Sequence, residues 1–154
     1  MHDKLFSVLT ATVDYEVRLA RDQHELRAAL ALRHDVFCVE QGVPENEELD
    51  GRDPEGMHLI AVSGQGLLAT CRLVLIGSIA QFSRLAVRPD ARRQGIATAL
   101  LDQADSLARD AGARRIVLHA QTYAQRLYEA AGYRARGGVF TEAEIEHVAM
   151  EKEL

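Results

Sequence analysis

Residues 85–101 constrain the fold of this chain more than any other segment, because they read as a strand, an arginine-rich turn and the start of a helix. Gly95 and Ala97 place small side chains in the first turn of that helix. The backbone N–H groups there lack intrahelical partners, and the helix dipole adds roughly half a positive charge. The segment therefore predicts a strand-to-helix connection that binds an anion, with a phosphate ester as the implied ligand.

The charge of this turn is opposite to the charge of the whole chain. The chain carries a formal charge of -5. Within residues 84–93, one acid, Asp90, stands against Arg84, Arg88, Arg92 and Arg93. This local reversal favours a compact anionic ligand, whereas the acidic overall balance argues against nucleic acid or an anionic membrane surface as a partner.

The length of 154 residues predicts one domain over residues 15–154, preceded by a lead-in over residues 1–14. Cys38 and Cys71 are too few for a disulfide framework or a paired metal motif, which favours a reducing cytoplasm. The apolar run Leu5–Val13 is far shorter than the roughly 20 residues that span a bilayer, so we expect no membrane anchor. The six histidines show no ligand spacing, and we expect no metal.

Apolar periodicity predicts the order strand, helix, loop, three strands, helix, strand, helix and two strands. The expected strands are 15–19, 58–63, 67–76, 79–87, 115–119, 133–140 and 145–153. The expected helices begin at the capping box 22–25 and cover 93–111 and 123–131, with a loop over 40–55. This order predicts an α/β (α+β mixed) fold, with a mixed, mostly antiparallel central sheet of about seven strands flanked by helices.

The element order and the pattern Arg92-x-x-Gly95-x-Ala97 resemble the GNAT superfamily of acyl-CoA-dependent N-acyltransferases. The pyrophosphate loop of that superfamily is Gln/Arg-x-x-Gly-x-Gly/Ala. A second stretch is similar to its Asn-x-x-Ala-x-x-Leu-Tyr-x-x-x-Gly-Phe signature. It reads Gln121-x-x-Ala124-x-x-Leu127-Tyr128-x-x-x-Gly132-Tyr133. The resemblance covers roughly residues 15–154, with two departures: Gln121 replaces Asn, which affects a cofactor hydrogen bond, and Tyr133 replaces Phe, which keeps an aromatic ring.

The N-terminal half adds a narrower resemblance. Residues 32–44 and the acidic residues 47–50 look like the ElaA-like branch of the superfamily. The substrates of that branch are poorly defined, so this resemblance sharpens the fold more than the function.

The resemblance implies acetyl-CoA as acyl donor. Its pyrophosphate would lie on the N–H groups of residues 93–98, and its pantetheine amides would pair with the strand edge at Leu85 and Val87. Arginines of the turn can also bind phosphate bidentately. The cofactor-binding residues expected on this basis are Leu85, Ala86, Val87, Arg92, Arg93, Gln94, Gly95, Ile96, Ala97, Thr98, Gln121, Ala124 and Tyr128.

Tyr128 occupies the position of the family's proton donor to the leaving thiolate, although a buried aromatic side chain that only packs on the sheet is the alternative. The base that deprotonates the amine is open between several acids and imidazoles. The expected catalytic residues are Tyr128, His119 and Glu40, with Glu48, Asp50 and His58 as further candidates for the base.

The stretch from Glu40 to Glu55 contains seven acids in sixteen residues, and is either a solvated loop or a surface that attracts a cationic amine. We expect an N-acetyltransferase that acts on a small amine or a peptide amine by direct attack in a ternary complex. The alternatives are a non-catalytic acyl-CoA sensor or interaction module on the same fold, and transfer of a longer acyl chain. An exposed edge strand near the C-terminus could pair two copies into a homodimer.

Overall fold

The computed structural model describes residues 14–154. The lead-in expected over residues 1–14 lies outside the described residues except for Asp14, and the run Leu5–Val13 lies entirely outside them. The strands are β1 (Tyr15–Leu19), β2 (Met57–Ser63), β3 (Gly66–Ile76), β4 (Ile79–Val87), β5 (Arg115–Gln121), β6 (Arg134–Glu142) and β7 (Ile145–Glu153). The helices are α2 (Gln23–Arg33), α3 (Glu45–Glu48), α4 (Ile96–Asp110) and α5 (Gln125–Ala130), with the π-helix η1 (His34–Glu40) and the short 3₁₀ turns η2 (Asp53–Glu55), η3 (Pro89–Ala91) and η4 (Thr122–Ala124).

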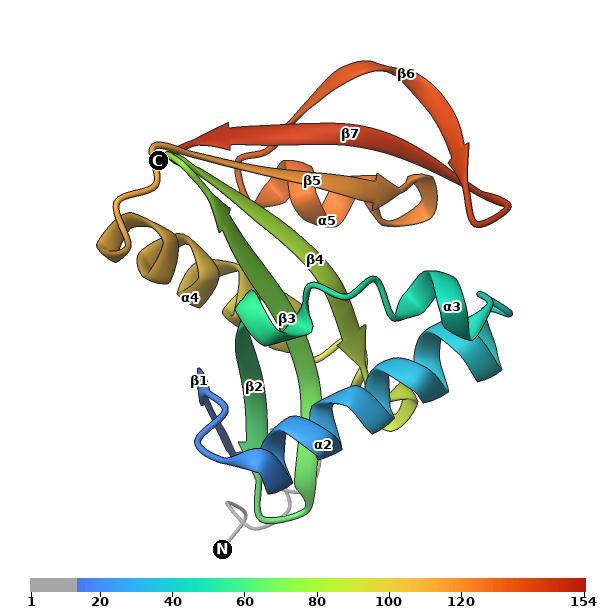
Figure 1. Cartoon of the computed structure of the whole chain (residues 1–154), viewed down its shortest axis with the longest axis vertical. Helices are drawn as coiled ribbons and strands as arrows, with labels where there is room; N and C mark the ends of the chain where they lie inside the picture. The colour runs from blue at the N-terminus through green and yellow to red at the C-terminus, as the bar shows by residue number, and fades with distance from the viewer. Residues whose placement is uncertain (1–13) are drawn as a thin grey trace, which may run out of the picture.

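All seven strands form one sheet in the order β1-β2-β3-β4-β5-β7-β6. Every neighbouring pair is antiparallel except β4 and β5, which confirms the predicted mixed, mostly antiparallel α/β architecture. The parallel pairing of β4 with β5 is limited to Ile79–Gln81 opposite Arg115–Val117. Beyond these residues the two strands separate, as Figure 1 shows. The facing backbone edges of β4 and β5 beyond these residues are therefore not paired with each other.

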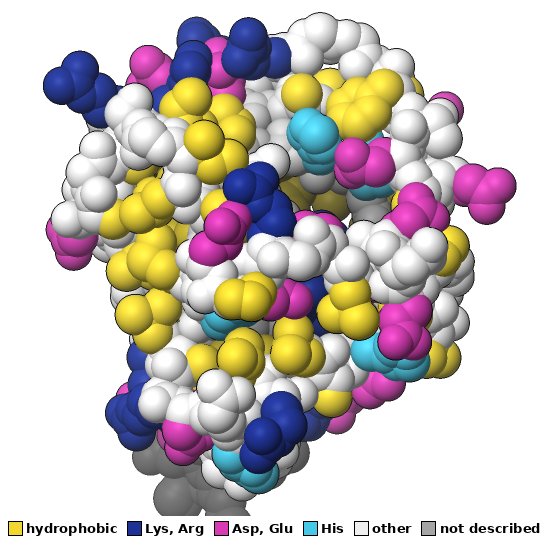
Figure 2. Space-filling model, in the orientation of Figure 1, with side chains coloured by type: hydrophobic (Ala, Val, Ile, Leu, Met, Phe, Trp, Pro, Cys, Tyr) yellow, Lys and Arg dark blue, Asp and Glu magenta, His cyan; other side chains and the backbone are white. Residues whose placement is uncertain are grey.

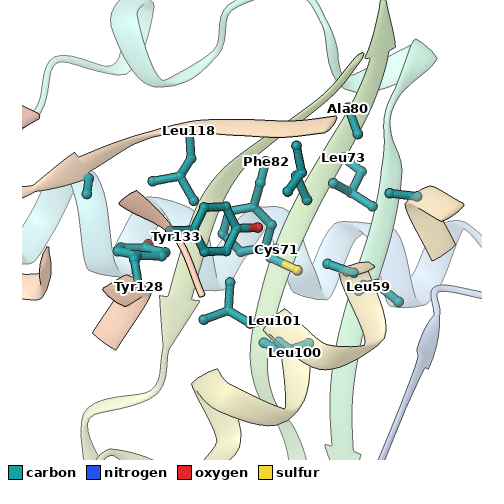
Figure 3. Packing of buried hydrophobic residues seen from close by; sticks show 14 of the residues in the cluster. Leu59, Cys71, Leu73, Ala80, Phe82, Leu100, Leu101, Leu118, Tyr128 and Tyr133 are labelled. Carbon is teal, nitrogen blue, oxygen red and sulfur yellow. The ribbon is translucent and has the colours of Figure 1, made fainter. Parts of the chain in front are cut away.

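Helices α2 and α4 cover opposite faces of strands β2 to β4 (Figure 1). One face of α4 is apolar and buried, because Ile96, Leu100 and Leu101 are all at most 1% exposed. These side chains meet Cys71, Phe82 and other core residues on the α4 side of the sheet (Figure 3). Burial of each such leucine stabilises the fold by about 2 kcal/mol, so α4 is held firmly against the sheet that it supports.

The N-terminus of α2 is capped as predicted, since the side chain of Asp22 accepts a hydrogen bond from the N–H of Glu25 at 2.9 Å. The Glu25 carboxylate in turn accepts from the N–H of Arg21 at 2.7 Å and pairs with Arg18. The start of α4 differs from the expectation. It begins at Ile96 rather than near residue 93, because Arg93 (φ 62°) and Gly95 (φ 82°) are left-handed.

The acidic segment 40–55 is more ordered than the predicted loop. It contains the short helix α3 and the turn η2, and it follows the π-helix η1 directly. Among residues 14–154, no helix has both the length and the apolar character needed to cross a membrane.

Candidate active site

A cleft of about 950 Å³ occupies the region where β4 and β5 separate. Its walls come from β4, β5, the start of α4, the end of η1 and the turn between β6 and β7. Figure 2 shows this face of the molecule, with histidine and acidic side chains grouped on the β6–β7 side. The cleft brings together residues from both halves of the chain.

The start of α4 forms one end of the cleft. The N–H of Ala99 makes the first bond of the helix, to the carbonyl of Gly95 at 3.1 Å. Within residues 14–154, the N–H groups of residues 96–98 donate to no backbone carbonyl, so they remain available to an anion. Arg93, Gly95, Ile96 and Ala97 line the cleft, whereas Gln94 and Thr98 are not among the lining residues. The Gln94 amide instead donates to the carbonyl of Asp90.

Two predicted site residues bind each other. Arg92 donates from both terminal nitrogens to the carboxylate of Glu40, at 2.7 and 2.8 Å, and its Nε donates to the carbonyl of Val87 at 3.0 Å. The hydrogen bonds from Arg92 hold the pKa of Glu40 below its usual range. A carboxylate with a lowered pKa is a weaker base, so the geometry favours Glu40 as a partner of Arg92 more than as the catalytic base.

Gln121, which stands where the family has Asn, also has a partner across the cleft. Its Nε2 donates to Oε1 of Gln41 at 2.9 Å, and Nε2 of Gln41 donates back at 3.4 Å. Gln41 follows the end of η1, so this pair joins η1 to the end of β5. Gln41 was not among the predicted site residues, because nothing in its local sequence indicates a contact with a residue 80 positions later.

The β4 wall contains a bulge. Thr70 pairs with Ala86 and Arg72 with Ser83, so Arg84 and Leu85 together lie opposite one residue of β3. Leu85 and Val87, which were expected to pair with the pantetheine amides, line the cleft. Arg84 also lines it and has a left-handed φ of 60°. Ala86 points the other way and is buried against Leu32 and Val36 of the α2–η1 layer.

Tyr128 lies on the floor of the cleft, with Ala124 nearby on its lining. Its ring is 7% exposed and makes edge-to-face contacts with Phe82 and Tyr133, with ring centroids 6.3 and 6.0 Å apart (Figure 3). Burial raises the pKa of Tyr128, so the phenol keeps its proton at neutral pH. The side chain is therefore both a core aromatic and a proton-bearing group on the cleft.

The acids at the end of α3 and just after it bind arginines. Glu48 is buried and binds Arg33 at 2.8 Å and Arg84 at 2.8 Å. Asp50 binds Arg72 at 2.7 Å. Further bonds join Asp53 to Arg33 and Arg72, and Nε2 of His58 lies 3.0 Å from the carbonyl of Asp53. Glu48, Asp50 and His58, which were candidates for the base, are thus engaged in this internal network.

His119 is half exposed on β5, and it lines the cleft. Its Nδ1 lies 3.2 Å from Oε2 of Glu142 at the end of β6, and its ring makes an edge-to-face contact with Phe140, with ring centroids 5.0 Å apart. His147 of β7 lies on the other side of the same carboxylate, with Nε2 3.9 Å from Oε1 of Glu142. Glu142 and His147 were not predicted, since only the pairing of β5, β7 and β6 brings them to His119.

Known proteins match both the sequence and this fold. The family model described as an acetyltransferase (GNAT) domain matches residues 35–154. YjcF, an uncharacterized N-acetyltransferase of Bacillus subtilis, is 29% identical over 136 residues, which cover 88% of this chain and 97% of that protein. Among solved structures, an acyl-CoA N-acyltransferase from Pseudomonas aeruginosa has a TM-score of 0.79 and 30% identity, and covers 91% of this chain and 99% of that one.

Escherichia coli ElaA has a TM-score of 0.80 at 22% identity, over 92% of this chain and all of that one (100%). It shares the fold, as expected from the resemblance of the N-terminal half to the ElaA-like branch. The chain therefore belongs to the GNAT family of acetyltransferases and is an acyltransferase enzyme.

Proposed function

We propose that this protein transfers an acetyl group from acetyl-CoA to a primary amine, by direct attack of the amine in a ternary complex. One observation supports the proposal most strongly. The cleft between the separated strands combines unpaired N–H groups at the start of α4 with the phenol of Tyr128. The first feature suits a diphosphate, and the second suits a leaving thiolate.

The pyrophosphate and the pantetheine arm of the acyl donor suit different groups of the protein. The N–H groups of residues 96–98 and the guanidinium of Arg93, which forms no ion pair within residues 14–154, suit the pyrophosphate. The edge of β4 beyond Gln81 does not pair with β5, so its backbone can bond the pantetheine amides as a further strand would. The similarity to an acyl-CoA N-acyltransferase supports the same choice of donor.

Each proton in the proposed acetyl transfer has a source and a destination. A base converts the ammonium to the free amine, whose nitrogen attacks the thioester carbonyl and then loses a second proton. The carbon–sulfur bond breaks, and the thiolate takes a proton from Tyr128. Of the two protons that the amine loses, one restores the Tyr128 phenol and the other is released to solvent. A backbone N–H of β4 near Leu85 would stabilise the oxyanion. Because burial raises the pKa of Tyr128, the phenol is protonated when the thiolate forms, although it is a weaker acid than a free tyrosine.

Two measurements on the whole protein test the proposal. Calorimetric titration with acetyl-CoA measures binding, and release of the CoA thiol is followed over a panel of alkylamines, polyamines, amino sugars and peptide amines. We expect binding together with thiol release that depends on at least one amine class. Binding without release over the whole panel would contradict transfer and indicate an acyl-CoA sensor, and absence of binding would contradict the donor.

A further inference from the structure

The ionic partners of Glu142 differ from those of Glu40, Glu48 and Asp50, which also line the cleft. Glu40 binds Arg92, and both Glu48 and Asp50 bind arginines. The ionic neighbours of Glu142 are two imidazoles, His119 and His147. Its negative charge is therefore not cancelled by an arginine or lysine within residues 14–154, and it faces the cleft at the turn between β6 and β7.

The contact with Glu142 determines which nitrogen of His119 carries the proton. Nδ1 lies 3.2 Å from the carboxylate, and an ionised carboxylate can only accept hydrogen bonds. The neutral ring therefore carries its proton on Nδ1 and has a free lone pair on Nε2. Phe140 packs its ring against the imidazole at 5.0 Å and limits its rotation. This is the arrangement that a general base needs, a basic nitrogen held in one orientation by a carboxylate behind it.

His147 adds a second place for a proton. Its Nδ1 lies 2.7 Å from the carbonyl oxygen of Ile145, which can only accept, so the neutral ring again carries its proton on Nδ1. Nε2 then presents a lone pair toward Oε1 of Glu142 at 3.9 Å. Two hydrogen-bond acceptors face each other there, and a proton that arrives on Nε2 converts the contact into an ion pair. The ring is 7% exposed and stacks on Phe140 at 5.9 Å.

We propose that His119 is the base that deprotonates the amine, and that Glu142 and His147 are its positioning residues; this inference rests on the proposed function. Nε2 of His119 takes the proton of the ammonium group, and Glu142 stabilises the imidazolium that results. His147 lies on the other side of Glu142. When the His147 ring is protonated, it stabilises the same carboxylate. The amine that fits is cationic in solution, since the carboxylate of Glu142 has no arginine or lysine partner within residues 14–154.

The test compares rates over about pH 5 to 9, where imidazoles titrate, in the wild type, Glu142→Gln, His119→Gln and the matched control Glu146→Gln. Glu146 lies on the same hairpin, is exposed and makes no ion pair within the described residues, so its variant repeats the charge change alone. The charged groups that face His119 from neighbouring strands are Glu142 and Arg136 on β6 and His147 on β7, and Arg136 is bound to Glu151. One amine is used throughout, so its own titration is common to all four proteins.

We expect Glu142→Gln to lower kcat about tenfold at neutral pH, because the imidazolium of His119 loses the carboxylate that orients and stabilises it. We expect His119→Gln to lose about 100-fold in kcat, while acetyl-CoA affinity stays unchanged in every variant and Glu146→Gln behaves as wild type. A Glu142→Gln enzyme with the same kcat as Glu146→Gln, or a His119→Gln enzyme with full turnover, overturns the inference. Absence of turnover in the wild type instead overturns the proposed function, so the two failures are distinct.

Discussion

Tyr128 and Tyr133 are neighbouring phenols with different surroundings. Tyr128 lines the cleft, whereas the hydroxyl of Tyr133 is buried and has no hydrogen-bond partner within the described residues. Burial raises the pKa of both. The pair therefore allows the effect of a lost hydroxyl on chemistry to be separated from its effect on packing.

We expect Tyr128→Phe to lower kcat about 100-fold, since a positioned general acid contributes at least that much. Its affinity for acetyl-CoA is expected to stay unchanged, because the ring and its contacts remain. The matched control Tyr133→Phe is expected to keep full turnover and to raise the free energy of unfolding by about 1 kcal/mol, because it removes an unsatisfied buried hydroxyl. Thiol-release kinetics, calorimetry and urea unfolding measure these effects, and wild-type turnover in Tyr128→Phe would falsify its role as the acid.

Glu40 competes with any phosphate that approaches Arg92. We expect Glu40→Gln to tighten CoA binding up to about fivefold, the strength of a partly exposed ion pair, and to leave kcat within about twofold of wild type. Glu45→Gln is the control, because Glu45 is exposed and its ionic neighbour is His34 rather than an arginine. Calorimetric titration with CoA provides the affinities. A loss of kcat without a change in affinity would instead identify Glu40 as the base.

At the scale of the element, the start of α4 depends on a left-handed glycine. We expect Gly95→Ala to lower the free energy of unfolding by about 1 kcal/mol, because a side chain is strained at its φ of 82°, and also to weaken CoA binding. Gly137→Ala is the matched control, since Gly137 has the same φ of 82° but lies on β6. Urea unfolding and CoA titration of both variants are the measurements. Equal affinities in the two variants would show that the start of α4 does not hold the diphosphate.

Elements with a long apolar pattern could be predicted from the sequence. The bounds of β1, β4 and β7 agree with the expected strands. The π-helix η1 could not be predicted, because seven residues are too few to separate its period from that of an α-helix. The prediction that α4 begins near residue 93 was wrong. Arg93 is left-handed, and no sequence signal indicates that conformation for a residue with a side chain.

The candidate site was predictable only where its residues lie in one segment. The turn from Arg92 to Ala97 carries its own pattern, and the cleft contains most of it. Glu142 and His147 meet His119 across β6, β7 and β5, which are non-local pairings. The arginine partners of Glu48 and Asp50 lie 15 to 36 positions away in the chain, so the acidic segment could not be distinguished from a solvated one.

At the scale of the whole molecule, the network around Arg72 makes stability depend on pH. The hydrogen bonds from Arg72 hold the pKa of Asp50 far below its ordinary value, which is near 4 in an unfolded chain. The stabilisation is therefore fully present above about pH 4 and is lost as the pH falls through the lower folded-state value.

We expect Asp50→Asn to lower the free energy of unfolding by about 2 kcal/mol at neutral pH, since it removes a charged hydrogen bond from a buried guanidinium. The difference from wild type is expected to shrink in acid, below about pH 4, where the wild type loses the same interaction. Asp102→Asn, on the exposed face of α4, is the control and is expected to match wild type. Urea unfolding at pH values on both sides of 4 measures the difference. A difference that does not change with pH would contradict this account.

Within residues 14–154, three residue pairs between β4 and β5 form all of the strand pairing that joins the two halves of the sheet. Under the proposed function, an acyl donor that bonds to the unpaired edge of β4 would extend this strand pairing. The donor would then stabilise the fold as well as react. Ligand binding at 100 times the dissociation constant adds about 2.7 kcal/mol to stability. Cells depleted of the donor would then hold a pool of this protein that proteases degrade faster, which ties its abundance to metabolic supply.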